Sequence, residues 1–331
     1  MYSDALEKIL RDHCTPAVVR AIEAGGDFAP LWNTIADAGF LDVCVAEDRG
    51  GAELPLPEQF PLLVLLGRYA VPLPVAQTMV ARALLDEAPA GLLTLSSAVV
   101  QVADGWRCPQ VPFGAIADHV LADDGEALLL FRCGERNRQP AGVYRSQTAT
   151  LVFARDEPPV RFARPHDNAH AAYGAAIHAA MMFGAMHVAL EMTLRHSGDR
   201  QQFGRSISKF QVIQHHLATM AEHVAGARVA AETAFQSAGR TPAYLPCAAA
   251  KAKASEVAAP VSAIAHAVHG AIGVTQEHDL QLFTRRLHEW RQLHGSEHHW
   301  NAVLGNAMIV RGLPIVEFVR GLSQPALRQA V

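Results

Sequence analysis

SGDRQQFGRSISKFQ, residues 197–211, separates two apolar, helix-like segments of the chain. The stretch contains two arginines, Arg200 and Arg205, two glycines and an isolated aromatic residue, Phe203. A connection between two packed helices needs only a few turn residues. This one is long and cationic, and an arginine in such a place can hold a phosphate through paired, charge-assisted hydrogen bonds. The stretch therefore indicates either a solvated loop or the binding site of an anionic ligand.

The ends of this stretch predict where the neighbouring helices stop and start. We expect the first helix to end at Ser197-Gly198, because glycine readily adopts the left-handed conformation of a helix C-terminus. We expect the next helix to begin near Ser208, since Ser208 and Gln211 have the spacing of a capping box. Both arginines then lie in the connection.

Apolar residues recur at steps of three and four on both sides of the connection. This spacing places each set on one helix face. Successive amphipathic helices bury their apolar faces against one another, which predicts a C-terminal four-helix bundle over residues 166–331. The four sets are Ile177, Met181, Gly184, Val188 and Met192; Ile213, Leu217, Met220, Val224 and Ala227; Val257, Val261, Ile264 and Val268; and Trp300, Leu304 and Ala307.

The first half of the chain divides into two parts of different character. Residues 1–90 alternate helical apolar spacing with turns such as Gly50-Gly51, which predicts an N-terminal helical domain. Residues 91–165 hold short apolar or alternating runs between turn residues, which predicts a shortened middle β domain. The sequence thus predicts a mainly α-helical chain with a small β domain between two helical ones.

Composition and charge limit the classes of function. Half of the 331 residues are hydrophobic and 18% are charged, as in a globular protein with a large core. The net charge of −4 argues against nucleic-acid binding. No uninterrupted run of about 18 apolar residues occurs, and the N-terminus lacks the order of a signal peptide. We therefore expect a cytoplasmic protein that binds neither nucleic acid nor membrane.

Cysteines and histidines give no sign of a metal centre. The five cysteines are scattered and include no C-x-x-C pair, which is typical of reduced thiols. His294 and His298 have the spacing of two ligands on one helix face, but no third ligand is evident. We expect no metal site.

Three segments carry a resemblance to a known family. DRQQFGRSISKFQVIQHHLATMAEHV, residues 199–224, resembles the acyl-CoA dehydrogenase signature R-x-x-F-G-x-x-I-x-x-F-Q-x-x-Q-x-x-L-A. LWNTIADAGFLDVCVAEDRGGAELPLPEQF, residues 31–60, resembles the N-terminal helical segment of that family. AVHGAIGVTQEHDLQLFTRR, residues 267–286, resembles its late glycine turn, with Ala271 in place of a second glycine. The resemblance implies a helical–β–helical flavoprotein that oxidises acyl-CoA thioesters to 2-enoyl-CoA with FAD, usually as an oligomer.

The resemblance also implies roles for single residues. Arg200 would contact the FAD pyrophosphate of a neighbouring subunit, and Phe203 would pack beside the same cofactor. Gln211 would lie near the adenosine half, although a capping role explains it equally well. Gly270 would let the backbone approach the FAD from the opposite subunit, and Ser296 matches a threonine that lies near the flavin.

The catalytic base is missing from both places where the family has it. The reaction needs a base to remove the thioester α-proton, and a glutamate whose pKa is raised in a dry site suits this task. The usual position here holds His294, and the alternative position, early in the first bundle helix, holds Gly174. A neutral imidazole can accept a proton, so His294 is a candidate base. Glu297 is near in sequence but is expected to face elsewhere.

The β segment also departs from the family. The usual T-E-P-x-x-G-S-D stretch, which meets the flavin ring, has no equivalent in residues 91–165. Three readings remain open. The chain is a subunit that contributes part of an FAD site beside a complete homologue; or it is a homo-oligomeric enzyme with His294 as its base; or it is a helical scaffold without flavin. Retention of Arg200, Phe203 and Gly270 speaks against the third.

Overall fold

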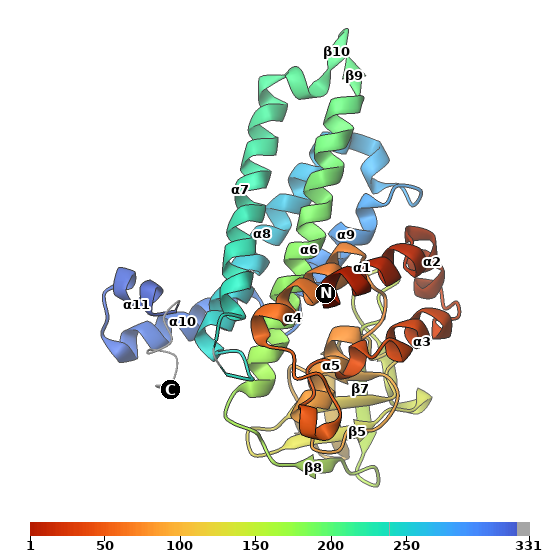
Figure 1. Ribbon diagram of the computed structural model, residues 1–331, viewed down its shortest axis with the longest axis vertical. Coiled ribbons are helices and arrows are strands. Elements are labelled where there is room, and N and C mark those ends of the chain that lie inside the picture. The colour runs from red at the N-terminus through yellow and green to blue at the C-terminus, as the bar shows by residue number, and fades with distance from the viewer. Residues whose placement is uncertain (238, 323–331) are drawn as a thin grey trace.

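The computed structural model describes residues 1–237 and 239–322. Helices form the first part of the chain, strands the middle and long helices the remainder (Figure 1). The predicted mainly α-helical fold with a small β region in the middle is confirmed. The domain limits at residues 90 and 165 stay a prediction, and residues 323–331 of the predicted bundle lie outside the described residues.

Short helices of the N-terminal region pack their apolar faces into the main hydrophobic core. Pro16 stands in the first turn of its helix, and the Thr15 hydroxyl caps that helix by accepting a hydrogen bond from the Val18 amide at 3.4 Å. The elements are α1 (Tyr2–His13), α2 (Pro16–Glu23), α3 (Ala29–Asp37), η1 (Phe40–Asp42), η2 (Glu47–Arg49), α4 (Leu56–Arg68) and α5 (Val75–Leu84).

The β region consists of two sheets packed face to face. One sheet has the order β1-β4-β5-β8, with β1 parallel to β4, and the other has the antiparallel order β2-β3-β7-β6. Phe131 of the first sheet stacks on Phe153 of the second at 4.4 Å between ring centroids. The elements are β1 (Leu93–Leu95), β2 (Val100–Val102), β3 (Gly105–Val111), β4 (His119–Asp123), β5 (Leu128–Arg132), η3 (Glu135–Asn137), β6 (Arg138–Pro140), β7 (Ala149–Ala154) and β8 (Val160–Phe162).

The C-terminal region is built on α6 (Ala169–Asp199), α7 (Gln211–Ala234) and α8 (Tyr244–His269), which pack against one another. Glycines let α4 approach α6 closely: a Cβ on Gly184 would lie 2.2 Å from the Val64 carbonyl oxygen. The helix that completes the bundle against α6 and α8 is α9 (Leu280–Gln292). The sequence analysis did not predict α9, and it took the helix that contains Trp300, which also packs against α8, as the fourth helix of the bundle.

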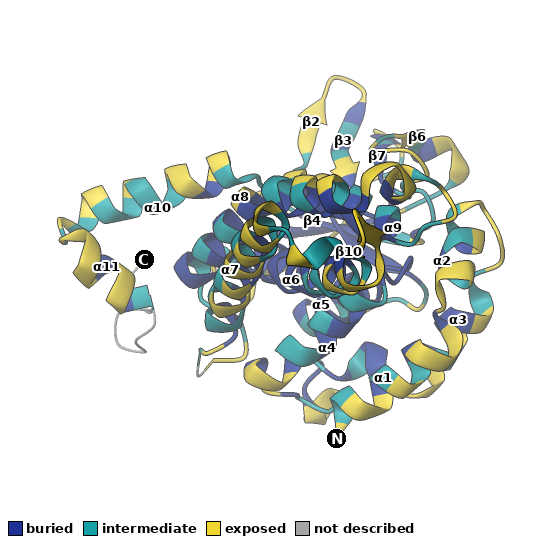
Figure 2. Ribbon diagram, turned by 90° about the horizontal axis from the view of Figure 1, so that it is seen from above, coloured by how far each residue is buried: buried dark blue, intermediate teal, exposed yellow. Residues whose placement is uncertain are grey.

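The helix around Trp300 is α10 (Glu297–Arg311), and with α11 (Ile315–Leu322) it projects from the body (Figure 2). Trp300 is the buried residue of α10. Only its first turns therefore pack against the bundle, which explains why its apolar spacing looked like that of a bundle helix.

The connection between α6 and α7 forms the far tip of the molecule (Figure 1). It consists of a short hairpin, β9 (Gln201–Gln202) and β10 (Arg205–Ser206), followed by η4 (Ile207–Lys209). The predicted helix ends are wrong by a few residues. Helix α6 continues to Asp199 without a left-handed glycine, and α7 begins only at Gln211, because the extended backbone at Phe210 separates it from η4.

Two helices of the described residues are long and apolar enough to cross a membrane, by length and composition alone: Ala169–Asp199 and Tyr244–Val274. The most apolar window of the first is 72% buried, and that of the second is 44% buried. Helices α10 and α11 pass the same test only as a pair bent by 113°. In the structure the two long helices form the core of the bundle.

Candidate functional site

The predicted site residues fall at opposite ends of α6. Gly174 lies near the start of this helix, where His294 covers it, and Arg200 directly follows its last residue. A helix rises about 1.5 Å per residue, so the 26 residues from Gly174 to Arg200 span about 39 Å. We call these two places the base end and the tip end.

At the base end, His294 occupies a tight turn between α9 and α10. His294 and Gly295 both have positive φ, 51° and 89°, and the Trp300 indole donates to the His294 carbonyl oxygen at 2.9 Å. The ring is buried, and its Nε2 donates to the Leu95 carbonyl oxygen of β1 at 3.2 Å. The imidazole is therefore clamped between the bundle and the β region.

The two base positions of the sequence analysis meet in space. A Cβ on Gly174 would lie 2.1 Å from Nδ1 of His294. His170 and His178 lie one turn before and one turn after Gly174 on the same face of α6, with ring centroids 6.2 and 4.9 Å from that of His294. The absent side chain at position 174 thus leaves the space that the His294 ring fills.

Burial keeps these imidazoles neutral. Desolvation, together with repulsion from Lys251, lowers the pKa of His178 to about 3. Desolvation, followed by repulsion from His178 and His170, holds the pKa of His294 well below its ordinary value. The Nδ1 of His178 donates to the Gly174 carbonyl oxygen at 2.8 Å. His294 is available as a proton acceptor, but a weakly basic one.

A buried lysine holds the turn beneath His294. The Lys251 ammonium donates to the Ser255 hydroxyl at 2.8 Å and to the carbonyl oxygens of Arg291 and Gly295 at 3.0 and 2.7 Å. Its side chain is fully buried, and desolvation lowers its pKa to about 7. Sequence reasoning missed this residue.

Ser296 and Glu297 follow the same turn. Ser296 is the N-cap of α10 by position, although its side chain makes no capping hydrogen bond. Glu297 pairs with Arg291 of α9. The pairing lowers the Glu297 pKa, so this carboxylate stays ionised and engaged.

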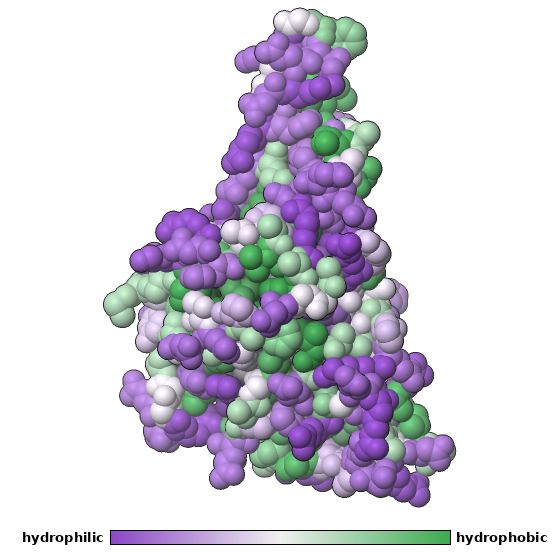
Figure 3. Space-filling view, turned by 90° about the vertical axis from the view of Figure 1, so that its right-hand side faces the viewer, coloured by the Kyte–Doolittle hydropathy of each residue, from purple (hydrophilic) through white to green (hydrophobic). Residues whose placement is uncertain are grey.

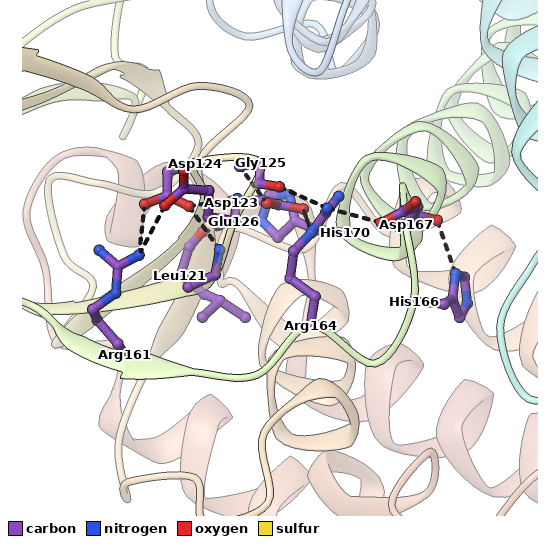
Figure 4. Close-up of polar contacts among 11 residues, drawn as sticks. Leu121, Asp123, Asp124, Gly125, Glu126, Arg161, Arg164, His166, Asp167 and His170 are labelled. Atoms are coloured by element: carbon purple, nitrogen blue, oxygen red, sulfur yellow. Dashed lines mark hydrogen bonds and ion pairs between the residues drawn. The ribbon is translucent and has the colours of Figure 1, made fainter.

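The start of α6 is tied to the β region (Figure 4). Arg164, in the segment before α6, donates to the Asp123 carboxylate at 3.1 Å. His170, in the first turn of α6, donates through Nε2 to the Leu121 carbonyl oxygen at 3.1 Å. These contacts fix Gly174 relative to β1 and hence to His294.

A cavity of about 610 Å³ lies beside Tyr173, the residue that precedes Gly174 in α6. Tyr173, which lines it, is buried and donates to the Arg240 carbonyl oxygen at 2.7 Å. The volume lies within the range of about 300–1,000 Å³ that is usual for small-molecule sites. Apolar side chains such as Leu54 and Leu84 line it together with Arg49 and Arg240, the latter paired with Glu53.

At the tip end, the side chains that the sequence singled out are exposed. Phe203 has a φ of 52° and is 91% exposed, with its ring edge-on to Phe210. Arg200 is exposed and makes no hydrogen bond or ion pair with any described residue through its side chain. Gln211 is exposed at the first position of α7. The tip therefore presents a cation and an aromatic ring that the rest of the described chain leaves uncovered.

Gly270 lies at the same end of the bundle, where α8 ends. The preceding residue, His269, stacks on His196 of α6 at 4.4 Å between centroids, four residues before Arg200. Gly270 has φ 65° and ψ −148°, a conformation that favours glycine, and a Cβ there would meet nothing within 4 Å. It opens η5 (Gly270–Val274), so this turn has room for close approach by another group.

Within the described residues, no group of three or more metal-binding side chains could hold a metal ion. Five cysteines are free thiols, as expected.

Comparison with known proteins assigns the chain to a family. Residues 168–305 match the family "Acyl-CoA dehydrogenase, C-terminal domain". The acyl-CoA dehydrogenase IpdE2 of Mycolicibacterium smegmatis is 30% identical over 303 residues, which cover 88% of this chain and 93% of the relative. The chain belongs to the acyl-CoA dehydrogenase family. The family is one of oxidoreductases, and the resemblance seen in the sequence is confirmed.

Solved structures agree on the fold. The ChsE4-ChsE5 complex from Mycobacterium tuberculosis is similar with a TM-score of 0.75 at 20% identity, covering 94% of this chain and 96% of that one. The Tcur3481-Tcur3483 steroid acyl-CoA dehydrogenase has a TM-score of 0.77 at 24% identity, covering 94% and 97%. At these identities the likeness shows the acyl-CoA dehydrogenase fold.

Proposed function

We propose that this chain is a subunit of an FAD-dependent acyl-CoA dehydrogenase and that it contributes the tip end to an FAD site completed by a homologous chain. One observation carries the proposal: Arg200 and Phe203 stand uncovered at the tip, whereas a weakly basic histidine fills the base end. A homologous partner with a carboxylate base would supply what the base end lacks.

The residues at the tip fit one half of FAD. An unpaired arginine binds phosphate oxygens through charge-assisted hydrogen bonds, and Phe203 offers an apolar face beside them. At the same end, the absence of a side chain at Gly270 would let a dinucleotide approach the backbone closely. The base end, which would take the flavin ring in a complete enzyme, lies about 39 Å away along α6, so one FAD cannot contact both ends of this chain. When bound, FAD accepts the substrate's β-hydride.

An acyl-CoA thioester suits the cavity beside Tyr173. Its apolar lining accommodates an acyl group, and Arg49 and Arg240 outnumber the single carboxylate of Glu53, which favours an anionic ligand. We propose acyl-CoA as the substrate class on these grounds, and a cytoplasmic location on the composition alone.

His294 as the base of a homo-oligomeric enzyme is the second candidate, favoured by its place over Gly174. Its lowered pKa disfavours it, because a base works best when its pKa lies near the working pH.

FAD retention by the Arg200→Ala variant tests the proposal. Loss of a charge-assisted phosphate contact should cost about 1.5–3 kcal/mol, which is about ten- to hundredfold in affinity. The assembled oligomer is passed through gel filtration, and bound flavin is measured by absorbance. Arg195→Ala, at an exposed arginine in the last turns of α6, is the matched control and should retain FAD as the wild type does. Equal retention by both variants would reject a role of the tip in FAD binding.

A further inference from the structure

Histidines gather at the tip end around the turn that follows α8. His269 stacks on His196 at 4.4 Å and meets the edge of His278 at 5.0 Å between centroids. They come from α8, α6 and the segment before α9, so three separate parts of the chain converge here. His266 of α8 lies close enough to affect His269 electrostatically, and His288 of α9 affects His266 in turn.

Two buried ring nitrogens in this cluster have no partner. His269 is 6% exposed, and its Nδ1 donates to the Ala265 carbonyl oxygen at 2.8 Å, which leaves Nε2 buried without a hydrogen bond among the described residues. His266 forms a hydrogen bond with the Thr284 hydroxyl through Nε2 at 2.9 Å. Its Nδ1 is likewise buried without a hydrogen bond among the described residues. Buried polar atoms without hydrogen-bond partners are rare in folded proteins. These two nitrogens therefore mark a place where a proton or a ligand can supply the missing interaction.

A further cation beside Arg200 would strengthen the binding of an anion at this end of the chain. Helices α6 and α8 both end here, and a helix C-terminus carries negative partial charge. Arg200 supplies one positive charge and Asp199, beside it, one negative charge. A protonated imidazole at the end of two helices is favoured by both dipoles and would supply this further cation.

We propose that His196, His269 and His278 form, with Arg200, a proton-accepting site for the diphosphate of an ADP-containing cofactor, and that binding of this cofactor takes up a proton. The proposal rests on the function proposed above, which brings FAD to this end of the chain. It adds that the histidines, and so the pH, set the affinity.

The free protein and the complex differ in protonation. Without an anion, burial and the neighbouring histidines lower the pKa of His269 to about 4, and burial and His278 lower that of His196. A bound diphosphate raises these values, because an opposite charge nearby favours the protonated form. Uptake of one proton strengthens binding by up to about tenfold for each unit by which the pH falls.

Calorimetry of FAD binding measures this proton directly. FAD is titrated into the flavin-depleted oligomer at pH 6, 7 and 8, in two buffers with different ionisation enthalpies. We expect tighter binding at lower pH and a proton uptake between zero and one. His196→Gln, at a half-buried position outside the core, and His269→Gln should both lose the pH dependence. His13→Gln, an exposed histidine of α1, is the control and should keep it.

The outcomes separate this inference from the proposed function. Binding of FAD that depends on Arg200 but is equal at pH 6 and 8, without proton uptake, overturns the histidine site and leaves the proposed function intact. Coenzyme A also contains a diphosphate. If coenzyme A shows the pH-dependent, histidine-dependent binding and FAD does not bind, the diphosphate site is supported and the proposed FAD role fails.

Discussion

A substitution at Gly174 tests how tightly the His294 ring packs against α6 at the base end. A Cβ there would come within 2.1 Å of the His294 ring, so Gly174→Ala should lower the free energy of unfolding by about 1–3 kcal/mol. In a His294→Ala background the clash is gone, and the same substitution should be neutral or stabilising, since alanine favours a helix over glycine. Urea unfolding of the four proteins of this cycle gives the coupling.

A glycine in an unobstructed helix gives the control for that cycle. Gly226 lies within α7, and a Cβ there would meet only Lys253 at 3.4 Å. Gly226→Ala should stabilise the protein in both backgrounds. A stabilising Gly174→Ala in the wild-type background would show that the His294 ring does not occupy the place described.

Lys251 makes stability depend on pH. Its pKa falls from 10.5 to about 7 on folding, so between these values the unfolded chain holds a proton that the folded chain has lost. The free energy of unfolding should therefore rise with pH across this window, by at most about 5 kcal/mol. Below about pH 7 both states are protonated, and the contribution no longer changes.

The Lys251→Met variant isolates this effect. Buried thiols act in the opposite direction, because burial raises their pKa, so the difference between wild type and variant is the quantity to follow. We expect this difference to change steadily from pH 7 to 10, measured by urea unfolding. Lys253→Met on the same helix, whose ammonium pairs with Glu256, should show a flat difference. A flat difference for Lys251→Met as well would mean that its ammonium is not desolvated.

Site residues could be predicted from the sequence where they belong to a motif with many matching positions. Residues whose role depends on contacts with distant parts of the chain could not. Arg200 and Phe203 were found because the signature stretch spaces them, and His294 because a neighbouring glycine turn marks the base position. Lys251 was missed because a lysine in an alanine-rich helix is typical of a solvated face. One signal was available: steps of three back from Val257 reach Ala254 and then Lys251, on the apolar face of α8.

Among the elements, the projecting helices α10 and α11 have an exposed apolar surface that indicates a contact with another subunit. Ile309 and Val310 of α10 are 74% and 86% exposed, and Ile315, Val316 and Val319 of α11 are exposed by more than half. Contiguous exposed apolar residues mark interaction surfaces. On the face that Figure 3 shows, apolar groups also gather near the middle of the molecule, with hydrophilic groups around them.

Charge on this pair should separate the subunits without unfolding them. Val310→Asp combined with Val319→Asp should weaken association at least about tenfold, since a carboxylate in an apolar interface loses its hydration. Light scattering with size-exclusion chromatography measures the oligomer, and circular dichroism should show unchanged helix content. Asn306→Asp, an added charge at an exposed polar position of α10, should have no effect. An unchanged oligomer in the double variant would place the interface elsewhere.

The sequence predicted which segments form helices better than it predicted which helices pack against one another. The three-and-four spacing identified α6, α7, α8 and α10, because each carries apolar residues on one face. It missed α9, whose sequence LQLFTRRLHEWRQ intersperses arginines and a glutamate among its buried leucines. Two of these arginines, Arg285 and Arg286, pair with Glu23 of α2, so the charges that hid the helix bind it to the N-terminal region.

For the whole molecule, the order of helical, β and helical regions followed from composition changes along the chain. The meeting of the two base positions did not, because Gly174 and His294 are 120 residues apart in sequence and only the packing of α6 against the turn joins them. The histidines of the tip end escaped notice for the same reason. Each is unremarkable in its own segment, and their effect depends on three segments converging.

The last prediction concerns activity and needs the whole assembly. This chain alone should show little or no acyl-CoA dehydrogenase activity, because hydride departure requires the α-proton to be removed in step and neither base position holds a carboxylate. General-base catalysis contributes typically about 10²–10⁴-fold, and a weakly basic, clamped His294 recovers little of it. Assays with several acyl-CoA thioesters and an artificial electron acceptor measure turnover of the isolated chain.

Co-expression with a complete homologue should restore that turnover, and the restored activity should survive His294→Ala, since the partner supplies the base. Arg200→Ala in the same complex should lose it together with bound FAD, whereas Arg195→Ala should not. Because His294→Ala also opens a cavity, its folding is checked by thermal melting before the rates are compared. Robust turnover of the isolated chain that vanishes in His294→Ala would instead make this histidine the base, and the chain a complete enzyme whose weak base is compensated by its tight placement over Gly174.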